Sequence, residues 1–353
     1  MAKCHYRRSR LPPAASSERS AVDVFSFLSQ PGLRILAVAV FLIAASGPSA
    51  RPLLAADAQH AGSECPGDCP EPLDVWVAST RRLPGVCRLP DSANLAIERL
   101  TTDGSCRCWN DASLADLLGE PWRPLVFFVH GNRYDSGDAK TQGISLARRL
   151  SMARPAAPQP RLVIFSWPSQ KQGLALKDGR RKYARAYADG HYLAWLLGQV
   201  PPEQPVAVVG YSFGALVTAE ALADLETVPP GGLSWADRPG RTQLVFVAPA
   251  LRCDALAPRG PFRETLAGLD RLTLLINSRD EALRFFPLLE PAVRADALGY
   301  VGMPSRWLPP DVEYAAADAA GIVGKLHTMR RYLDSATLVE MIAAGTLDGL
   351  VAE

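Results

Sequence analysis

The pentapeptide Gly-Tyr-Ser-Phe-Gly at residues 210–214 holds the first side chain whose setting suggests chemistry. It follows the apolar run VAVV and precedes ALVTAEALADL, which has the composition of a helix. A serine between two glycines at a strand-to-helix turn forms a nucleophile elbow, in which the sharp turn lifts the hydroxyl above the sheet. The pattern therefore predicts Ser212 as a nucleophile. The alternative is a plain turn that happens to contain two glycines.

A nucleophilic serine needs a base, usually histidine, and a carboxylate that orients the base. In chains with this elbow the acid and then the histidine follow the serine. Of the five histidines only His327 follows Ser212, so His327 is the predicted base, and a surface or helix-capping histidine is the alternative. Asp280 directly follows the apolar run RLTLLINS and is the predicted acid, with Asp254 as the second candidate. The position of Asp280 also suits a helix N-cap.

A second apolar run, LVFFV, ends in His130-Gly131. Backbone N–H groups near such a turn, together with the N–H after the nucleophile, can stabilise an oxyanion. We therefore expect the oxyanion hole to consist of Phe213 and either Asn132 or Arg133. Because His130 precedes the serine in the chain, we expect it to have a structural role.

Aromatic residues near these motifs are the candidates for substrate binding. They are Trp167, Tyr211 and Trp307, although apolar residues at such places are more often part of the core. The Pro-rich segment 281–310 is a candidate lid, judged from its position alone. No metal and no organic cofactor is required by these groups.

The elements that must position these residues follow from the apolar runs. Most runs are continuous rather than alternating, as in strands covered on both faces of a parallel sheet. Helical patterns separate them at 138–151, 180–198, 214–225 and 328–344. The alternation predicts an α/β fold with a doubly wound, mostly parallel sheet. The expected strands are 75–79, 125–131, 162–168, 205–212, 243–250, 271–278 and 312–317.

The first 73 residues differ from the rest of the chain. Residues 1–55 are basic, then apolar from Ile35 to Ala45, then rich in small residues, as in a secretory signal. We expect export to the periplasm or the extracellular space, with the leader either cleaved or kept as a membrane anchor through residues 33–46. A buried helix is the alternative. Residues 56–73 are a Pro/Cys-rich linker, and 74–353 form the folded domain.

Cysteines cluster in an N-terminal Cys-rich extension and in an insert at 84–110. After Cys4, which lies in the leader, six remain, and an even number in an exported chain suggests disulfides whose pairing stays open. A zinc site is the weaker alternative, because the spacings are poor for zinc. The cysteines considered for zinc are Cys65, Cys69, Cys106 and Cys108.

Composition excludes some classes of function. The 353 residues carry 38 Lys plus Arg against 36 Asp plus Glu, a net charge of +2, which does not indicate a nucleic-acid surface. The turn HGNRYDSGD lacks the G-x-G-x-x-G pattern of dinucleotide-binding oxidoreductases. The oligomeric state stays open.

Taken together, these motifs resemble the α/β-hydrolase superfamily over residues 74–345. The chain is similar to an uncharacterised bacterial branch of serine hydrolases in VWVASTRRL, the HG loop, FSWPS at 165–169, the helix KYARAYADG and the turn Ser278-Arg279-Asp280. The resemblance implies a reaction class but no substrate.

The expected activity is hydrolysis of a carboxylic ester, or a related acyl bond, through an acyl-enzyme on Ser212. The substrate would be a small-molecule or lipid acyl compound. Two alternatives stay open: a catalytically silent binding protein with the same fold, and an acyltransferase that uses the same three residues.

Overall fold

The computed structural model describes residues 73–103, 106–155, 158–173, 175–227, 234–291 and 293–350. The predicted leader 1–55, with the segment 33–46, and nearly all of the linker 56–73 lie outside the described residues. Within the described part, no helix has the length and apolar character needed to cross a membrane.

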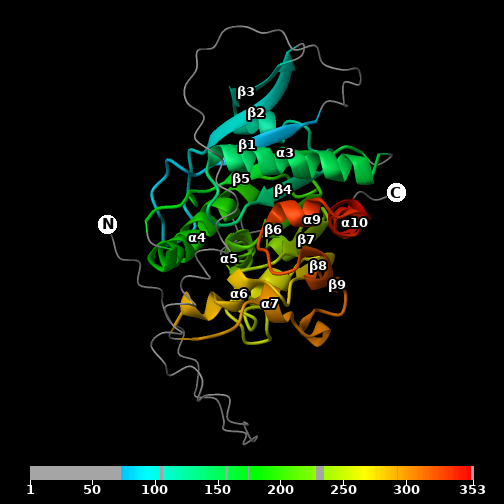
Figure 1. The fold of residues 1–353 in the computed structure, drawn as a ribbon. Helices are drawn as coiled ribbons and strands as arrows, with labels where there is room; N and C mark the ends of the chain where they lie inside the picture. Colours follow the sequence, from blue (N-terminus) through cyan, green and yellow to red (C-terminus); the bar gives the residue numbers. More distant parts are fainter. Residues whose placement is uncertain are drawn as a thin grey trace, which may run out of the picture.

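One mixed sheet forms the centre of the described chain (Figure 1). Its strand order is β3-β2-β1-β5-β4-β6-β7-β8-β9. The seven strands β1, β5, β4, β6, β7, β8 and β9 pair in parallel with their neighbours. Strand β2 pairs antiparallel with β1 and with β3. The strands are β1 (Val75–Ser79), β2 (Ala96–Asp103), β3 (Cys106–Ala112), β4 (Leu125–Val129), β5 (Arg161–Ser166), β6 (Val206–Tyr211), β7 (Thr242–Val247), β8 (Arg271–Ile276) and β9 (Glu313–Asp318).

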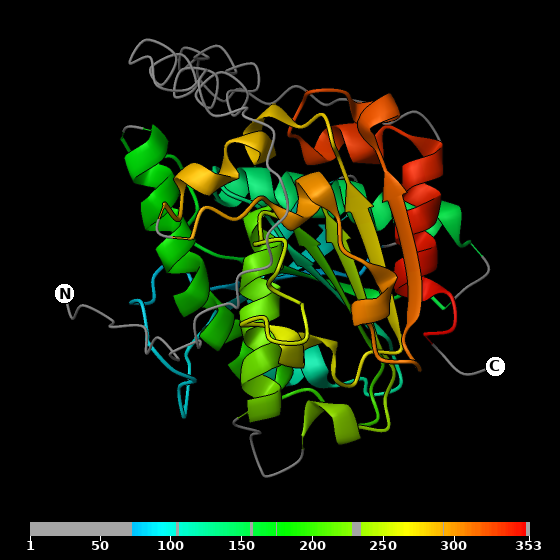
Figure 2. The ribbon, with the colours of Figure 1, turned by 90° about the horizontal axis from the view of Figure 1, so that it is seen from below.

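Helices cover both faces of this sheet, as Figure 2 shows. Helices α4 and α5 pack on each other and lie on one face, with α5 against β4 and β6. Helices α3, α9 and α10 contact one another on the opposite face. The longer helices are α3 (Ser136–Ala153), α4 (Ala175–Leu197), α5 (Phe213–Thr227) and α10 (Ala336–Leu347). The shorter ones are α2 (Leu114–Leu118), α6 (Glu281–Arg284), α7 (Leu298–Val301), α8 (Ala320–Val323) and α9 (Met329–Leu333).

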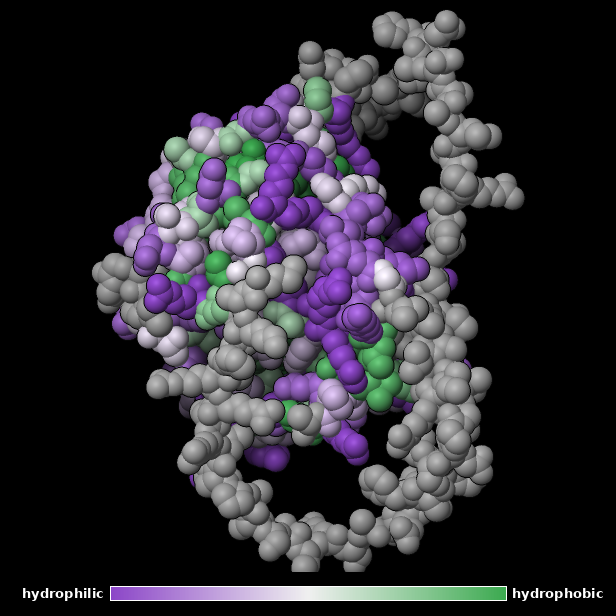
Figure 3. All heavy atoms as spheres, turned by 90° about the vertical axis from the view of Figure 1, so that its left-hand side faces the viewer, coloured by the Kyte–Doolittle hydropathy of each residue, from purple (hydrophilic) through white to green (hydrophobic). Residues whose placement is uncertain are grey.

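Burial explains why the central strands were recognisable in the sequence. Every residue of β4, β5, β6 and β7 is buried, so the middle of each strand is a continuous apolar run, and polar residues stand only at the ends of β5 and β7. The edge strand β9 instead exposes most of its side chains. The face on the α4 side is largely hydrophilic, with apolar residues in separate patches (Figure 3).

The strand register brings the predicted site residues to one edge of the sheet. Val129 pairs with Gly210, Tyr211 with Val247, and Val247 with Leu275. The carboxyl ends of β4, β6, β7 and β8 therefore lie side by side, and in open α/β sheets this edge is where ligands bind.

The predicted fold class is confirmed, and two elements differ in detail. Within the Cys-bearing insert, β2 and β3 form a hairpin that extends the sheet beyond β1. This hairpin lacks a continuous apolar run, because β3 is largely exposed at the edge. The predicted helix 328–344 is two helices, since Ser335 caps the start of α10 through the N–H of Leu338.

Candidate active site

Ser212 sits at the turn between β6 and α5, in a strained backbone conformation. Its φ is +54°, a left-handed value that side chains other than glycine rarely adopt. The glycines explain how this turn packs: a Cβ on Gly214 would lie 1.9 Å from the carbonyl oxygen of Val129, and a Cβ on Gly131 would lie 2.9 Å from the Cβ of Ser212. The elbow therefore presses against the end of β4.

His327 connects Ser212 to Asp280. Its Nε2 lies 2.7 Å from the Ser212 Oγ, and its Nδ1 lies 2.6 Å from Oδ2 of Asp280. A carboxylate accepts hydrogen bonds, so the proton of a neutral imidazole belongs on Nδ1 and the lone pair of Nε2 faces the serine hydroxyl. The ring of Tyr211 stacks on the imidazole, with the ring centroids 5.4 Å apart. The structure thus brings together the three residues selected from the sequence.

Asp280 both caps a helix and binds the histidine. Its Oδ1 accepts hydrogen bonds from the N–H groups of Ala282 and Leu283 at the start of α6, while Oδ2 is left for His327. The carboxylate is fully buried. The second candidate, Asp254, instead pairs with the guanidinium of Arg252 and is half exposed.

The loop that carries His327 is fixed by a residue that the sequence analysis missed. The buried side-chain amide of Asn277 donates to the carbonyl oxygens of Gly324 and Leu326, at 2.9 and 3.4 Å. Gly324 adopts a φ of +68°, and the carbonyl of Lys325 accepts from the N–H of Glu281. The loop and the turn that holds Asp280 are therefore linked.

Two of the backbone N–H groups considered for the oxyanion hole are unpaired within the described chain. Among the described residues, the N–H groups of Phe213 and Asn132 have no acceptor. The N–H of Arg133 is occupied, because it donates to the carbonyl of Ser169 at 2.8 Å and lies 2.9 Å from Oδ1 of Asn132. Of the two residues considered after Gly131, this geometry leaves Asn132.

His130 supports the loop that carries Asn132. Its Nε2 accepts the backbone N–H of Trp167, so its Nδ1 carries the proton and donates to the carbonyl of Gly131 at 2.9 Å. Burial lowers the pKa of His130 to about 3, and the charge of Arg81 adds to this shift against the opposing hydrogen bond to Gly131. The imidazole is therefore neutral at ordinary pH.

Arg81 is a second residue that the sequence analysis did not select. From the end of β1 its guanidinium donates to Oγ of Ser166, to the side chain of Gln170 and to the carbonyls of Tyr134 and Asp135. These bonds join the ends of β1 and β5 to the loop after β4. Arg81 lies in the segment VWVASTRRL, which carries part of the family resemblance, but the sequence alone gives this residue no role.

Comparison with known proteins identifies the family of this chain. A family model described as "Alpha/beta hydrolase of unknown function (DUF900)" matches residues 110–302, which is more than half of the chain. The chain belongs to this family. Curated proteins gave no match to the sequence.

Two solved structures are similar to this α/β hydrolase. One, described as an esterase/lipase from an uncultured bacterium, is 11% identical, covers 89% of this chain and 97% of its own, and has a TM-score of 0.35. The other, a gene product of Listeria innocua, is 12% identical, covers 63% and 93%, and has a TM-score of 0.32. At this level neither structure bears on the activity of the chain.

The aromatic residues predicted to bind substrate have other contacts in the structure. Trp167 is fully buried, stacks on His130 and donates its indole N–H to the carbonyl of that residue, so it does not line an open cleft. Tyr211 is nearly as buried and lies against His327. Trp307 is partly exposed, and its carbonyl accepts from Arg263.

A cavity of about 360 Å³ lies beside β8 and β9. Its lining includes Ile276, Met303 and Tyr314, and none of Ser212, His327 and Asp280. Part of the candidate lid, residues 301–304, lines this cavity. A lid function for 281–310 stays a prediction.

Among the described residues, Cys108 and Cys253 are free thiols. Neither therefore belongs to a disulfide. Cys65 and Cys69 lie outside the described residues, and disulfide bonding of the remaining cysteines stays a prediction.

Proposed function

We propose that this α/β hydrolase is a serine esterase that cleaves a carboxylic ester, or a related acyl bond, through an acyl-enzyme on Ser212. The observation that carries the proposal is the pair of short contacts at His327: 2.7 Å to the serine hydroxyl and 2.6 Å to Asp280. A hydroxyl, an imidazole and a buried carboxylate linked in this order have the geometry of an activated nucleophile.

In the proposed first step, Oγ of Ser212 attacks the ester carbonyl carbon while His327 takes the hydroxyl proton at Nε2. Asp280 holds the imidazole in the required tautomer and stabilises the positive charge that develops on it. The N–H groups of Phe213 and Asn132 bind the negative oxygen. The protonated His327 then gives its proton to the leaving alcohol, and the acyl group stays on Ser212.

In the second step, water attacks the acyl-enzyme. His327 takes a proton from the water, and its return to Ser212 releases the carboxylic acid. Neither step requires a metal or an organic cofactor. A small-molecule or lipid acyl compound is the proposed substrate class.

The proposal is tested with a series of p-nitrophenyl esters of increasing acyl length. Wild-type protein should release p-nitrophenol, and Ser212→Ala should lower kcat at least about 10³-fold. A matched control is Ser278→Ala, which removes a hydroxyl that bonds Asp318 rather than His327. Equal rates for wild type and Ser212→Ala would overturn the proposal. Addition of an alcohol acceptor distinguishes hydrolysis from acyl transfer by the ester product.

Export is the second part of the proposal. It is supported only by the basic, apolar and small-residue order of residues 1–55. Fractionation of cells that express the full chain, with mass measurement of the N-terminus, separates a cleaved leader from an anchor through 33–46. Recovery of the intact chain in the cytoplasm would contradict export.

A further inference from the structure

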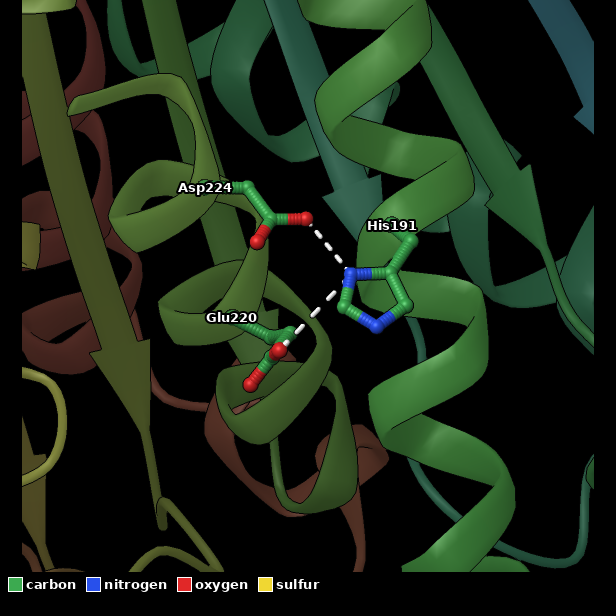
Figure 4. A group of neighbouring side chains, drawn as sticks. All are labelled: His191, Glu220 and Asp224. Atoms are coloured by element: carbon green, nitrogen blue, oxygen red, sulfur yellow. Dashed lines mark hydrogen bonds and ion pairs between the residues drawn. The ribbon is translucent and has the colours of Figure 1, made fainter. Parts of the chain in front are cut away.

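A histidine and two carboxylates meet between helices α4 and α5 (Figure 4). His191 comes from α4, and Glu220 and Asp224 come from α5. The Nδ1 of His191 lies 2.5 Å from Oδ2 of Asp224 and 3.7 Å from Oε1 of Glu220. One ligand atom of each residue lies within 4.8 Å of the others. Figure 4 shows both carboxylates directed toward the same ring nitrogen.

The backbone brings these three side chains together. Glu220 and Asp224 are four residues apart, so they lie on the same face of α5. Gly190 lets α4 approach that face: a Cβ at this position would lie 2.5 Å from the Cβ of Glu220. The residue after this glycine is His191, so the imidazole meets the carboxylates beside a close contact of the two helices.

The cluster places two carboxyl groups beside one imidazole in a confined space. The side chains of His191, Glu220 and Asp224 are 10%, 12% and 17% exposed. Within the described residues, neither carboxylate has a lysine or arginine within ion-pair distance, and His191 is their shared partner. One imidazole is therefore shared by two partly buried carboxyl groups. Partly buried carboxylates of this kind are stabilised by pairing or by a cation.

We propose that His191, Glu220 and Asp224 bind one divalent transition-metal ion, with zinc as the best match, as a clamp between α4 and α5. An imidazole nitrogen with two carboxylate oxygens suits zinc better than magnesium or calcium, which prefer oxygen ligands. Tetrahedral zinc with bonds of about 2.0–2.1 Å places its ligand atoms about 3.3 Å apart. The His191 to Glu220 contact is already close to this value, and the His191 to Asp224 contact must widen by less than about 1 Å.

The proposed metal site is separate from Ser212. Glu220 lies eight residues after Ser212 along α5, a rise of about 12 Å. The ion would therefore hold α5 against α4 and stabilise the fold, without contact with the reacting atoms. Water would complete its coordination through the exposed side of the cluster.

The test measures binding and stability, not activity. The full-length protein is stripped with EDTA, exchanged into metal-free buffer and titrated with Zn²⁺ by calorimetry. We expect one ion per chain and a rise in Tm of about 5 °C at a hundredfold excess over Kd. Co²⁺ in place of Zn²⁺ should give visible absorption bands from the same site.

Two conservative variants keep the test independent of folding. Asp224→Asn retains an oxygen that accepts from His191, and Glu220→Gln removes a carboxylate that no cation other than His191 balances among the described residues. Each should fold without metal yet bind Zn²⁺ about 100-fold more weakly. Glu226→Gln on the same helix, outside the cluster, should bind as wild type. His327→Ala should also bind as wild type, which excludes zinc at the serine site.

Two results would overturn the proposal. One is the absence of saturable Zn²⁺ binding to the stripped wild-type protein. The other is unchanged Zn²⁺ affinity in both Glu220→Gln and Asp224→Asn. Either result would leave the cluster as a charged hydrogen bond between His191 and Asp224 with a neighbouring carboxylate.

Discussion

Asp280 binds His327 with one carboxylate oxygen and caps α6 with the other. Oδ2 lies 2.6 Å from Nδ1 of the imidazole, and Oδ1 accepts two backbone N–H groups. The two interpretations offered by the sequence, a helix cap and an orienting acid, are therefore compatible. The cap fixes the position of the carboxylate, and the fixed carboxylate in turn fixes the ring.

This double contact predicts how Asp280 variants differ. Asp280→Asn keeps an oxygen for the cap but presents its amide NH₂, a donor, to Nδ1 of His327, which favours the wrong tautomer of the imidazole. We therefore expect kcat to fall about 10³- to 10⁴-fold with little loss of stability. Asp280→Ala should lose activity and also about 1 kcal/mol of stability through the cap. The checks are ester hydrolysis and urea unfolding. Asp254→Asn is the control, and if it lost as much activity as Asp280→Asn the assignment would be wrong.

The backbone strain at Ser212 predicts a trade between stability and activity. Glycine adopts a φ of +54° without the cost that a Cβ imposes. Ser212→Gly and Ser212→Ala should both be inactive, but the glycine variant should be more stable than the alanine variant by about 1 kcal/mol. Urea unfolding of the two variants measures this difference. Equal stability would indicate that the elbow stores no strain.

Arg81 is predicted to position the loop after β4, which carries Asn132. Lysine at this position cannot reproduce four bonds to Ser166, Gln170, Tyr134 and Asp135. Arg81→Lys should therefore lower kcat about 10-fold with a smaller change in KM. The reason is that the proposed hydrogen bond from the N–H of Asn132 stabilises the negative oxygen of the transition state more than the carbonyl of the substrate. Arg82→Lys, at an exposed neighbour, should change neither. A change in KM alone for Arg81→Lys would contradict this role.

Stability should fall in mild acid because of His130. Its pKa is about 3 in the fold, against about 6.5 for an unfolded histidine. Since only the unfolded chain takes up this proton, the stabilisation is complete above about pH 6.5 and is lost as pH falls toward 3. The slope is about 1.4 kcal/mol per pH unit, or about 2 kcal/mol between pH 7 and pH 5.

The pH effect is isolated with His130→Gln. This side chain does not titrate, so its unfolding free energy should fall less between pH 7 and pH 5 than that of wild type. Urea titrations at several pH values give the difference directly. Parallel pH profiles for the two proteins would show that His130 is not the responsible group.

The sequence predicted the fold well because the buried parallel strands are continuous apolar runs. It also selected Ser212, His327 and Asp280, since their order along the chain and the small number of histidines left few choices. Glycines near the elbow mark close contacts that a Cβ would prevent. The apolar runs, the order of the three residues and the glycines are all visible in the sequence, so they require no tertiary information.

Other features depend on contacts between distant segments. Arg81 reaches residues 49 or more positions away in the chain, and Asn277 holds a loop 47 positions away. Trp167 and Tyr211 are buried, and no sequence pattern distinguishes a buried aromatic residue from one that lines a cleft. The side chains of His191, Glu220 and Asp224 come from two helices, so no continuous sequence motif indicates that they lie together.

The most direct test of the account is whether Ser212 is a reactive nucleophile. Folded protein is treated with a fluorophosphonate probe and measured by intact mass, with Ser212→Ala, His327→Ala and Asp280→Asn alongside. The account predicts a single adduct on wild type, none on Ser212→Ala, and much slower labelling of the other two variants. If folded wild-type protein gains no adduct, or if Ser212→Ala labels as fast as wild type, Ser212 is not the nucleophile.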